Sequence, residues 1–214
     1  LICWGDKDRA YNRNQVDTLN ENIIDSNLII FEGCSHNVHL ENPQKFNKTI
    51  SDFLKSHISS ANIQGLCHGS RNGFEQNFFN NEIKNSSIIG TDISETAINY
   101  QNSIVHDFHD EKKEWINNFD FIYSNSLDQS YDPQKALDVW LKQIKKDRFI
   151  ILEHSDQHGV LSSGKMDPFG VEANFFPYLL SDWFGHRISI KIIKSVKKNK
   201  SHAPVWFFVI KKIF

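Results

Sequence analysis

The chain has 214 residues, of which 39% are hydrophobic and 13% aromatic, so it can fill a sizeable core and is not a disordered protein. Its 24 basic and 26 acidic residues give a formal net charge of -2, which excludes the positive field that general nucleic-acid binding requires. No apolar run in the sequence is long enough to cross a bilayer. We therefore expect small molecules as partners, and neither nucleic acid nor a membrane.

The three cysteines lack the spacing of a metal site, and no charged-then-apolar leader precedes them. A reduced, cytoplasmic setting without a bound metal is therefore expected. The chain opens with Leu rather than Met and enters strand-like sequence at once. We expect it to be a piece of a longer polypeptide.

The first segment shows a short alternation of strands and helices. The expected elements, in chain order, are a strand at 1–4, a helix at 14–24, a strand at 27–32 and a helix at 43–57. Apolar Phe46, Ile50, Phe53 and Leu54 support the last helix by their spacing. Small and polar residues at 56–62 follow it, which places a domain boundary near residue 60.

A longer alternation begins after that boundary. Strands are expected at 63–67, 87–90, 104–106, 119–124 and 149–153, and helices at 74–80, 95–102 and 133–144. Strands separated by helices predict a parallel sheet covered on both faces. The β-rich runs 188–193 and 205–210 have no helix between them, so they predict an antiparallel hairpin. The fold class is α/β.

A glycine-containing turn connects the first expected strand of the second segment to the helix that follows it. Gly69 and Gly73 lie four residues apart in the stretch 65–75. Glycines let the backbone pass close to a ligand, and the helix that follows offers free N–H groups. A tight connection without a ligand explains the turn equally well.

Two acids follow at the ends of the next two expected strands. Asp92 ends the run Ile88-Ile-Gly-Thr-Asp, the position that accepts ribose hydroxyls in nucleoside-binding doubly wound folds. Asp107 stands beside Phe108 after the third strand, where an adenine ring could be bonded and stacked. The alternative for Asp107 is a helix cap or turn residue.

These features, in this order, resemble the class I S-adenosylmethionine-dependent methyltransferases over residues 62–214. The resemblance implies a Rossmann-like sheet, parallel with a C-terminal antiparallel hairpin, S-adenosylmethionine as cofactor, and methyl transfer. The residues that it assigns to cofactor binding are Cys67, His68, Gly69, Ser70, Arg71, Asn72, Gly73, Asp92, Ile93, Asp107, Phe108 and Asn125. The turn is poorer in glycine than is usual for the family. NAD is the competing cofactor, but the G-x-G-x-x-G spacing is absent and the hairpin is foreign to the dinucleotide-binding plan.

The sequence is less specific about the methyl acceptor and the catalytic base than about the cofactor. A sulfonium donor is already activated, so a catalytic base is optional. Asp128, His154 and His158 follow the fourth and fifth strands and are the candidate bases, although each histidine could equally be a surface or core-edge residue. An aromatic stretch at 174–184 could cover an acceptor or could be ordinary helix packing. We expect an unidentified small-molecule or glycan acceptor.

The first segment resembles another family. Residues 1–9 and 31–43 are similar to the last two strands of α/β-hydrolases, which implies that Asp8 and His36 are the acid and base of a triad. No G-x-S-x-G elbow occurs in the sequence, so the nucleophile would have to lie upstream. Hydrolase activity is therefore not expected from this chain alone.

The sequence thus predicts a hydrolase C-terminal fragment at 1–58 and a methyltransferase domain at 62–214. Two alternatives remain open for the whole protein. One is an α/β-hydrolase fusion whose serine lies upstream, and the other is a non-catalytic cofactor-binding module. The sequence indicates no oligomeric state.

Overall fold

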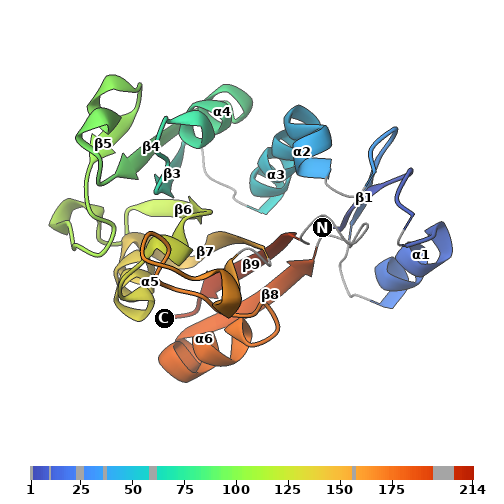
Figure 1. Ribbon diagram of the computed structural model, residues 1–214. Coiled ribbons are helices and arrows are strands. Elements are labelled where there is room, and N and C mark those ends of the chain that lie inside the picture. The colour runs from blue at the N-terminus through green and yellow to red at the C-terminus, as the bar shows by residue number, and fades with distance from the viewer. Residues whose placement is uncertain are drawn as a thin grey trace.

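The computed structural model describes residues 2–9, 11–22, 27–35, 38–57, 62–155, 158–194 and 205–214. The described residues form a two-stranded and a seven-stranded sheet (Figure 1). None of the helices among them is both long and apolar enough to span a bilayer.

The smaller sheet belongs to the N-terminal segment. Its elements are β1 (Ile2–Gly5), α1 (Arg13–Asn22), β2 (Leu28–Phe31), α2 (Val38–Glu41) and α3 (Pro43–His57). The two strands pair in parallel, as a strand–helix–strand unit requires. Trp4 and Val16 form a small buried cluster between this sheet and α1.

The larger sheet carries the second segment. Its strands are β3 (Ile63–His68), β4 (Ser86–Asp92), β5 (Ser103–Val105), β6 (Phe119–Ser124), β7 (Ile144–Ser155), β8 (Ile188–Lys194) and β9 (Val205–Lys212). The order is β5-β4-β3-β6-β7-β9-β8. The first five strands run parallel, and β9 is antiparallel to both β7 and β8. The predicted parallel sheet with a closing antiparallel hairpin is confirmed.

Helices cover both faces of this sheet (Figure 1). On one face lie α3 and α4 (Phe74–Glu82), and on the other lie α5 (Pro133–Gln143) and α6 (Phe176–Phe184). On β6, Phe121 packs into the core beneath α3 and α4, whereas Ile122 packs into the opposite core. Burial on both faces explains why this strand is apolar almost throughout.

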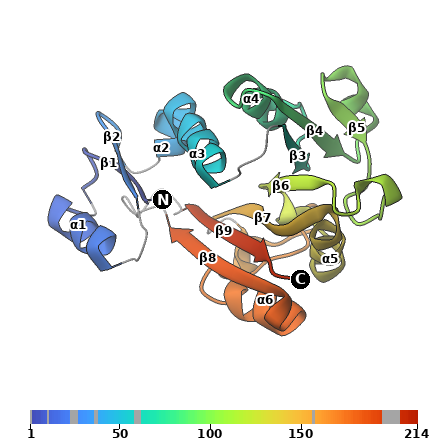
Figure 2. The ribbon, with the colours of Figure 1, turned by 180° about the vertical axis from the view of Figure 1, so that it is seen from behind.

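The N-terminal segment shares a core with the larger sheet. The ring of Phe46 on α3 lies 5.5 Å from that of Phe207 on β9, and both belong to one cluster with Phe31 of β2. Figure 2 shows the smaller sheet beside the start of β9. The apolar face of α3 is therefore buried against the second segment. The division near residue 60 stays a prediction, and residues 58–61 lie outside the described ranges.

The structure decides two of the expectations, for residues 95–102 and for the aromatic stretch at 174–184. The predicted helix at 95–102 is instead a short 3-10 turn over Glu95–Asn99, in which only Ala97 is buried, so no apolar stripe holds a longer helix against the sheet. In the aromatic stretch, Phe176, Leu180 and Phe184 face the core along α6, which is ordinary helix packing for these three.

Candidate cofactor and acceptor site

The candidate residues of the second segment lie at or just beyond the carboxyl ends of the five parallel strands, β3 to β7. The strand order reverses between β3 and β6, because β4 lies on one side of β3 and β6 on the other. In doubly wound sheets, ligands bind outside the carboxyl ends of the strands at such a switch point. We call this side of the sheet the ligand edge.

The glycine turn lies at the centre of the ligand edge. Gly69 and Gly73 adopt positive φ values of 70° and 76°. A Cβ atom at Gly69 would lie 2.5 Å from the Cβ of Ser126, so this position requires glycine for two reasons. The Ser70 amide donates to the carbonyl of Thr91 on β4 at 2.9 Å. The turn is therefore held tightly between β4 and the segment after β6.

Asp92 is fixed by two backbone amides. The Arg71 amide donates to its Oδ2 at 2.9 Å, and the Ser94 amide donates to its Oδ1 at 2.9 Å. Each carboxylate oxygen keeps a further lone pair. Ile93, next in the chain, is 70% exposed. Asp92 thus stands beside the glycine turn as a rigid acceptor for a pair of hydroxyl groups, and Arg71 and the exposed Asn72 lie next to it.

Cys67 and His68 turn their side chains into the two cores. Burial raises the pKa of Cys67 well above its usual value. The His68 ring stacks on Trp140 at 4.7 Å, accepts from the Thr91 hydroxyl through Nδ1 at 2.8 Å and donates to Gln143 through Nε2 at 2.9 Å. Burial lowers its pKa to about 3. Only the backbone of these two residues can face a ligand.

Asp107 and Phe108 also differ in exposure. The Phe108 ring is buried against His68 and Trp140, with centroids 6.1 and 5.4 Å away. The Asp107 side chain is 37% exposed. Partial burial raises the pKa of Asp107, but hydrogen bonds from the amide and ring of His109 outweigh it, so the pKa lies below its usual value. Asp107 is an ionised acceptor at the ligand edge.

A further polar cluster lies on the face of α3 and α4. The Tyr123 hydroxyl donates to Glu153 Oε2 at 2.6 Å, and the Asn125 amide donates to Glu75 Oε1 at 3.5 Å. Oε2 of Glu75 is buried and has no hydrogen-bond partner among the described residues. Burial, and then the charge of Glu153, raise the pKa of Glu75. Asn125 was predicted from the sequence, but neither glutamate was. Their places in the first turn of α4 and at the end of an apolar strand could have indicated them.

The three candidate bases lie together on the opposite face. Nε2 of His158 is 3.7 Å from Oδ2 of Asp128, and the His154 and His158 rings are 5.2 Å apart. Burial raises the pKa of Asp128, His158 opposes this and the charge of Asp167 adds to it. Burial also lowers the pKa of His154 to about 4, and its Nε2 donates to the Val171 carbonyl at 2.9 Å. His154 is thus bonded within the fold, whereas Asp128 and His158 form a pair.

Two predicted positions contribute less. Asp8 lies in the turn after β1, where its amide donates to the Gly5 carbonyl at 2.9 Å. His36 lies outside the described residues, so the predicted pairing of Asp8 with His36 stays a prediction. Among the described residues, no group of three or more His, Cys, Asp or Glu side chains could hold a metal ion.

Solved structures share this architecture. The plantazolicin methyltransferase BpumL in complex with SAH aligns with a TM-score of 0.61 and 14% identity, over 82% of this chain and 88% of that one. A SAM-dependent methyltransferase from Aquifex aeolicus aligns with a TM-score of 0.57 and 14% identity, over 94% and 98%. The [4+2]-cyclase SpnF aligns at 0.59 with 10% identity, over 78% and 81%. The chain therefore has the Rossmann-like fold of these proteins.

Comparison of the sequence alone finds short matches to lipases and no methyltransferase family. No protein-family model matches the chain. Monoacylglycerol lipase ABHD6 of Bos taurus is 35% identical over 65 residues, which is 30% of this chain and 19% of the lipase. The Mus musculus protein is 38% identical over 55 residues, or 26% and 16%. The matched part is less than a fifth of each lipase, so the similarity is to a fragment of these enzymes.

Proposed function

We propose that the chain binds S-adenosylmethionine at the ligand edge and transfers its methyl group to a small-molecule or glycan acceptor. The observation that carries the proposal is Asp92, whose carboxylate is oriented by the Arg71 and Ser94 amides beside a glycine turn. The likeness to methyltransferases solved with this cofactor's product supports it. The cyclase with the same fold is a reminder that fold alone does not decide chemistry.

The groups at the ligand edge fit the parts of this cofactor. Asp92 suits the two ribose hydroxyls, and ionised Asp107 suits an exocyclic amine, which can only donate. The partnerless Oε2 of Glu75 suits the ammonium group of an amino acid, because a buried acceptor gains most from a charged donor. The bound cofactor would supply an activated methyl group on a sulfonium centre.

The chain's own contribution on the acceptor side is positioning and proton acceptance. A hydroxyl acceptor loses its proton when it is methylated. Asp128 can take that proton because burial raises its pKa toward the working range of a base, and Nε2 of His158 lies 3.7 Å from its Oδ2. An acceptor without an ionising proton would not need this pair.

The lipase similarity favours a second function for the longer protein. If a serine nucleophile lies upstream, Asp8 and His36 would complete a hydrolase triad. A reading frame without an upstream G-x-S-x-G elbow would exclude this candidate.

Replacing Asp92 with alanine tests the leading proposal. Loss of a charged acceptor for two hydroxyls should weaken S-adenosylhomocysteine binding by about tenfold to a hundredfold in calorimetric titration. Asp182→Ala, at an exposed position on α6, is the matched control and should bind like the wild type. Equal affinity for the wild type and Asp92→Ala would refute the assignment of the ligand edge.

A further inference from the structure

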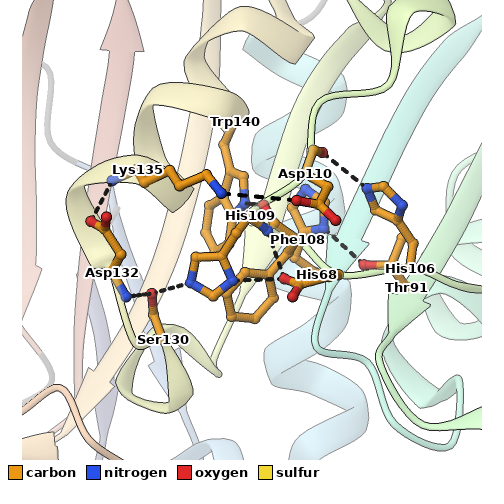
Figure 3. A network of polar contacts seen from close by, with 11 residues as sticks. His68, Thr91, His106, Phe108, His109, Asp110, Ser130, Asp132, Lys135 and Trp140 are labelled. Carbon is orange, nitrogen blue, oxygen red and sulfur yellow. Dashed lines mark hydrogen bonds and ion pairs between the residues drawn. The ribbon is translucent and has the colours of Figure 1, made fainter.

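A buried hydrogen-bond chain runs behind Asp107. Its Oδ1 accepts from the His109 amide at 2.9 Å and from Nδ1 of the His109 ring at 2.6 Å. Nε2 of the same ring is 2.7 Å from the Ser130 hydroxyl, and the Asp132 amide donates to that hydroxyl oxygen at 3.2 Å (Figure 3). The chain links the segment after β5 to the segment after β6.

The bonds at the two ends of this chain have a determined direction. Ionised Asp107 can only accept, so Nδ1 of His109 carries a proton. The Asp132 amide can only donate, so the Ser130 oxygen accepts from it. Between them, Nε2 of His109 bonds to the Ser130 hydroxyl on the far side of the ring. His109 is therefore held in one orientation, with Nδ1 toward Asp107.

The order Ser–His–Asp is that of a hydrolase triad, but this set cannot act as one. His109 is 3% exposed and Ser130 is 1% exposed. The His109 ring is covered by the ring of Phe108, whose centroid is 4.6 Å away (Figure 3). It is also covered by Tyr131, whose ring stacks on it with the centroids 3.8 Å apart. No substrate can reach the Ser130 hydroxyl, so of Ser130, His109 and Asp107 only Asp107, whose side chain is 37% exposed, can meet a ligand.

Both bonds from His109 go to Oδ1, and neither uses Oδ2 of Asp107. With Oδ1 occupied and the carboxylate ionised, Oδ2 is the acceptor that remains for a ligand at the ligand edge. We propose that His109 is a positioning residue, which holds Asp107 with Oδ2 presented to the exocyclic amino group of an adenine ring, and that Ser130 holds the far side of the His109 ring in the orientation that makes this possible. The inference rests on the proposed cofactor and names the residues that give the site its preference for adenine.

The test compares two ligands rather than one. Calorimetric titrations use S-adenosylhomocysteine and its analogue in which hydrogen replaces the 6-amino group. The wild type should prefer the amino compound by about tenfold or more, the value of one hydrogen bond to a charged group. His109→Leu should lose most of this preference, because its side chain no longer bonds to Oδ1. His109→Asn should retain part of it, because its amide can donate near the position of Nδ1.

Ser130→Ala provides a second variant in which the ring stays in place. We expect a smaller fall in the preference, because only the bond that holds the far side of the His109 ring is lost. His186→Asn, an exposed histidine whose ring contacts Phe214, is the control and should behave as the wild type. Thermal unfolding of each variant checks that it folds.

The outcomes separate this inference from the proposed function. If folded wild type binds neither compound, the proposed cofactor is wrong and the inference falls with it. If the wild type binds and prefers the amino compound while His109→Leu and Ser130→Ala keep the full preference, the proposed function stands and the role of His109 is refuted. A wild type that binds both ligands equally would also refute it.

Discussion

The two regions of the molecule differ in what their strands position. In the seven-stranded region, the ends of the parallel strands β4, β5 and β6 bring Asp92, Asp107 and Asp128 to one side of the sheet. The two-stranded region brings together little chemistry among its described residues, and its largest burial is that of α3 and β2 against the other region. Its candidate acid Asp8 lies in a turn.

The two kinds of comparison with known proteins also differ. The lipases are more than 30% identical to this chain, but the match covers less than a fifth of each lipase. The methyltransferase structure is only 14% identical, but it shares the fold over 82% of this chain. Short-range sequence identity therefore relates this chain to lipases, whereas the fold relates it to methyltransferase structures. In the structure, the N-terminal region packs against one face of the larger sheet through α3 and β2.

The largest expected effect comes from the core of the seven-stranded region. Trp140 is fully buried, stacks on His68 and donates through Nε1 to the Phe108 carbonyl at 3.0 Å. Trp140→Ala should lower the free energy of unfolding by about 3–5 kcal/mol through the cavity and the lost bond. Urea denaturation measures this. A loss below about 1 kcal/mol would contradict the packing.

The junction between the regions is tested by Phe46→Ala. Because Phe46 packs on Phe207 across the junction, this change should lower the stability of the whole chain by about 3 kcal/mol. Fluorescence and circular dichroism should still report one coincident transition. Two separate transitions, with the main one unchanged, would mean that the regions fold independently and that the shared core does not couple them.

Acidification should weaken the seven-stranded region through His68. The unfolded histidine binds a proton near pH 6.5, whereas the folded one stays neutral down to about 3, so the unfolded state binds more protons in this window. Stability is therefore complete above pH 6.5 and falls as the pH drops toward 3, by about 2 kcal/mol near pH 5. His154, lowered to about 4, acts in the same direction. Denaturation from pH 7 to 5 of the wild type and His68→Gln should give a smaller slope for the variant, and equal slopes would contradict this origin.

The smallest effect is expected on the surface of the two-stranded region. Arg13 and Asp17 form an exposed ion pair one helical turn apart on α1, with Nε and Oδ1 2.8 Å apart. Arg13→Ala should change stability by only about 0.3–0.5 kcal/mol, and less at high salt. A loss above about 1 kcal/mol would show that α1 contributes more to the chain than its exposure implies.

Much of the seven-stranded region could be predicted, because its strands are apolar runs separated by amphipathic helices and its acids stand at strand ends. The direction of individual side chains was harder. His68 lies two residues after Leu66 on one strand, and this alternation places its ring in the same core. Applied to the glycine turn, the same rule would have separated His68 and Cys67 from the ligand-facing residues.

The features that could not be predicted depend on tertiary contacts, which local sequence patterns do not specify. The spacing of Phe46 and Ile50 predicts an apolar face on α3, but nothing in that pattern says which sheet the face covers. Likewise Ser130 lies 21 residues after His109, and only the pairing of β5 with β4, of β4 with β3 and of β3 with β6 brings their segments together.

The proposed cofactor site is tested by calorimetric titration of the purified chain with S-adenosylmethionine and, separately, with NAD. We expect micromolar binding of S-adenosylmethionine and none of NAD, because Asp92 and Asp107 can accept from its ribose and adenine while the turn lacks the dinucleotide spacing. Binding of NAD alone, or of neither compound by a folded sample, would contradict it.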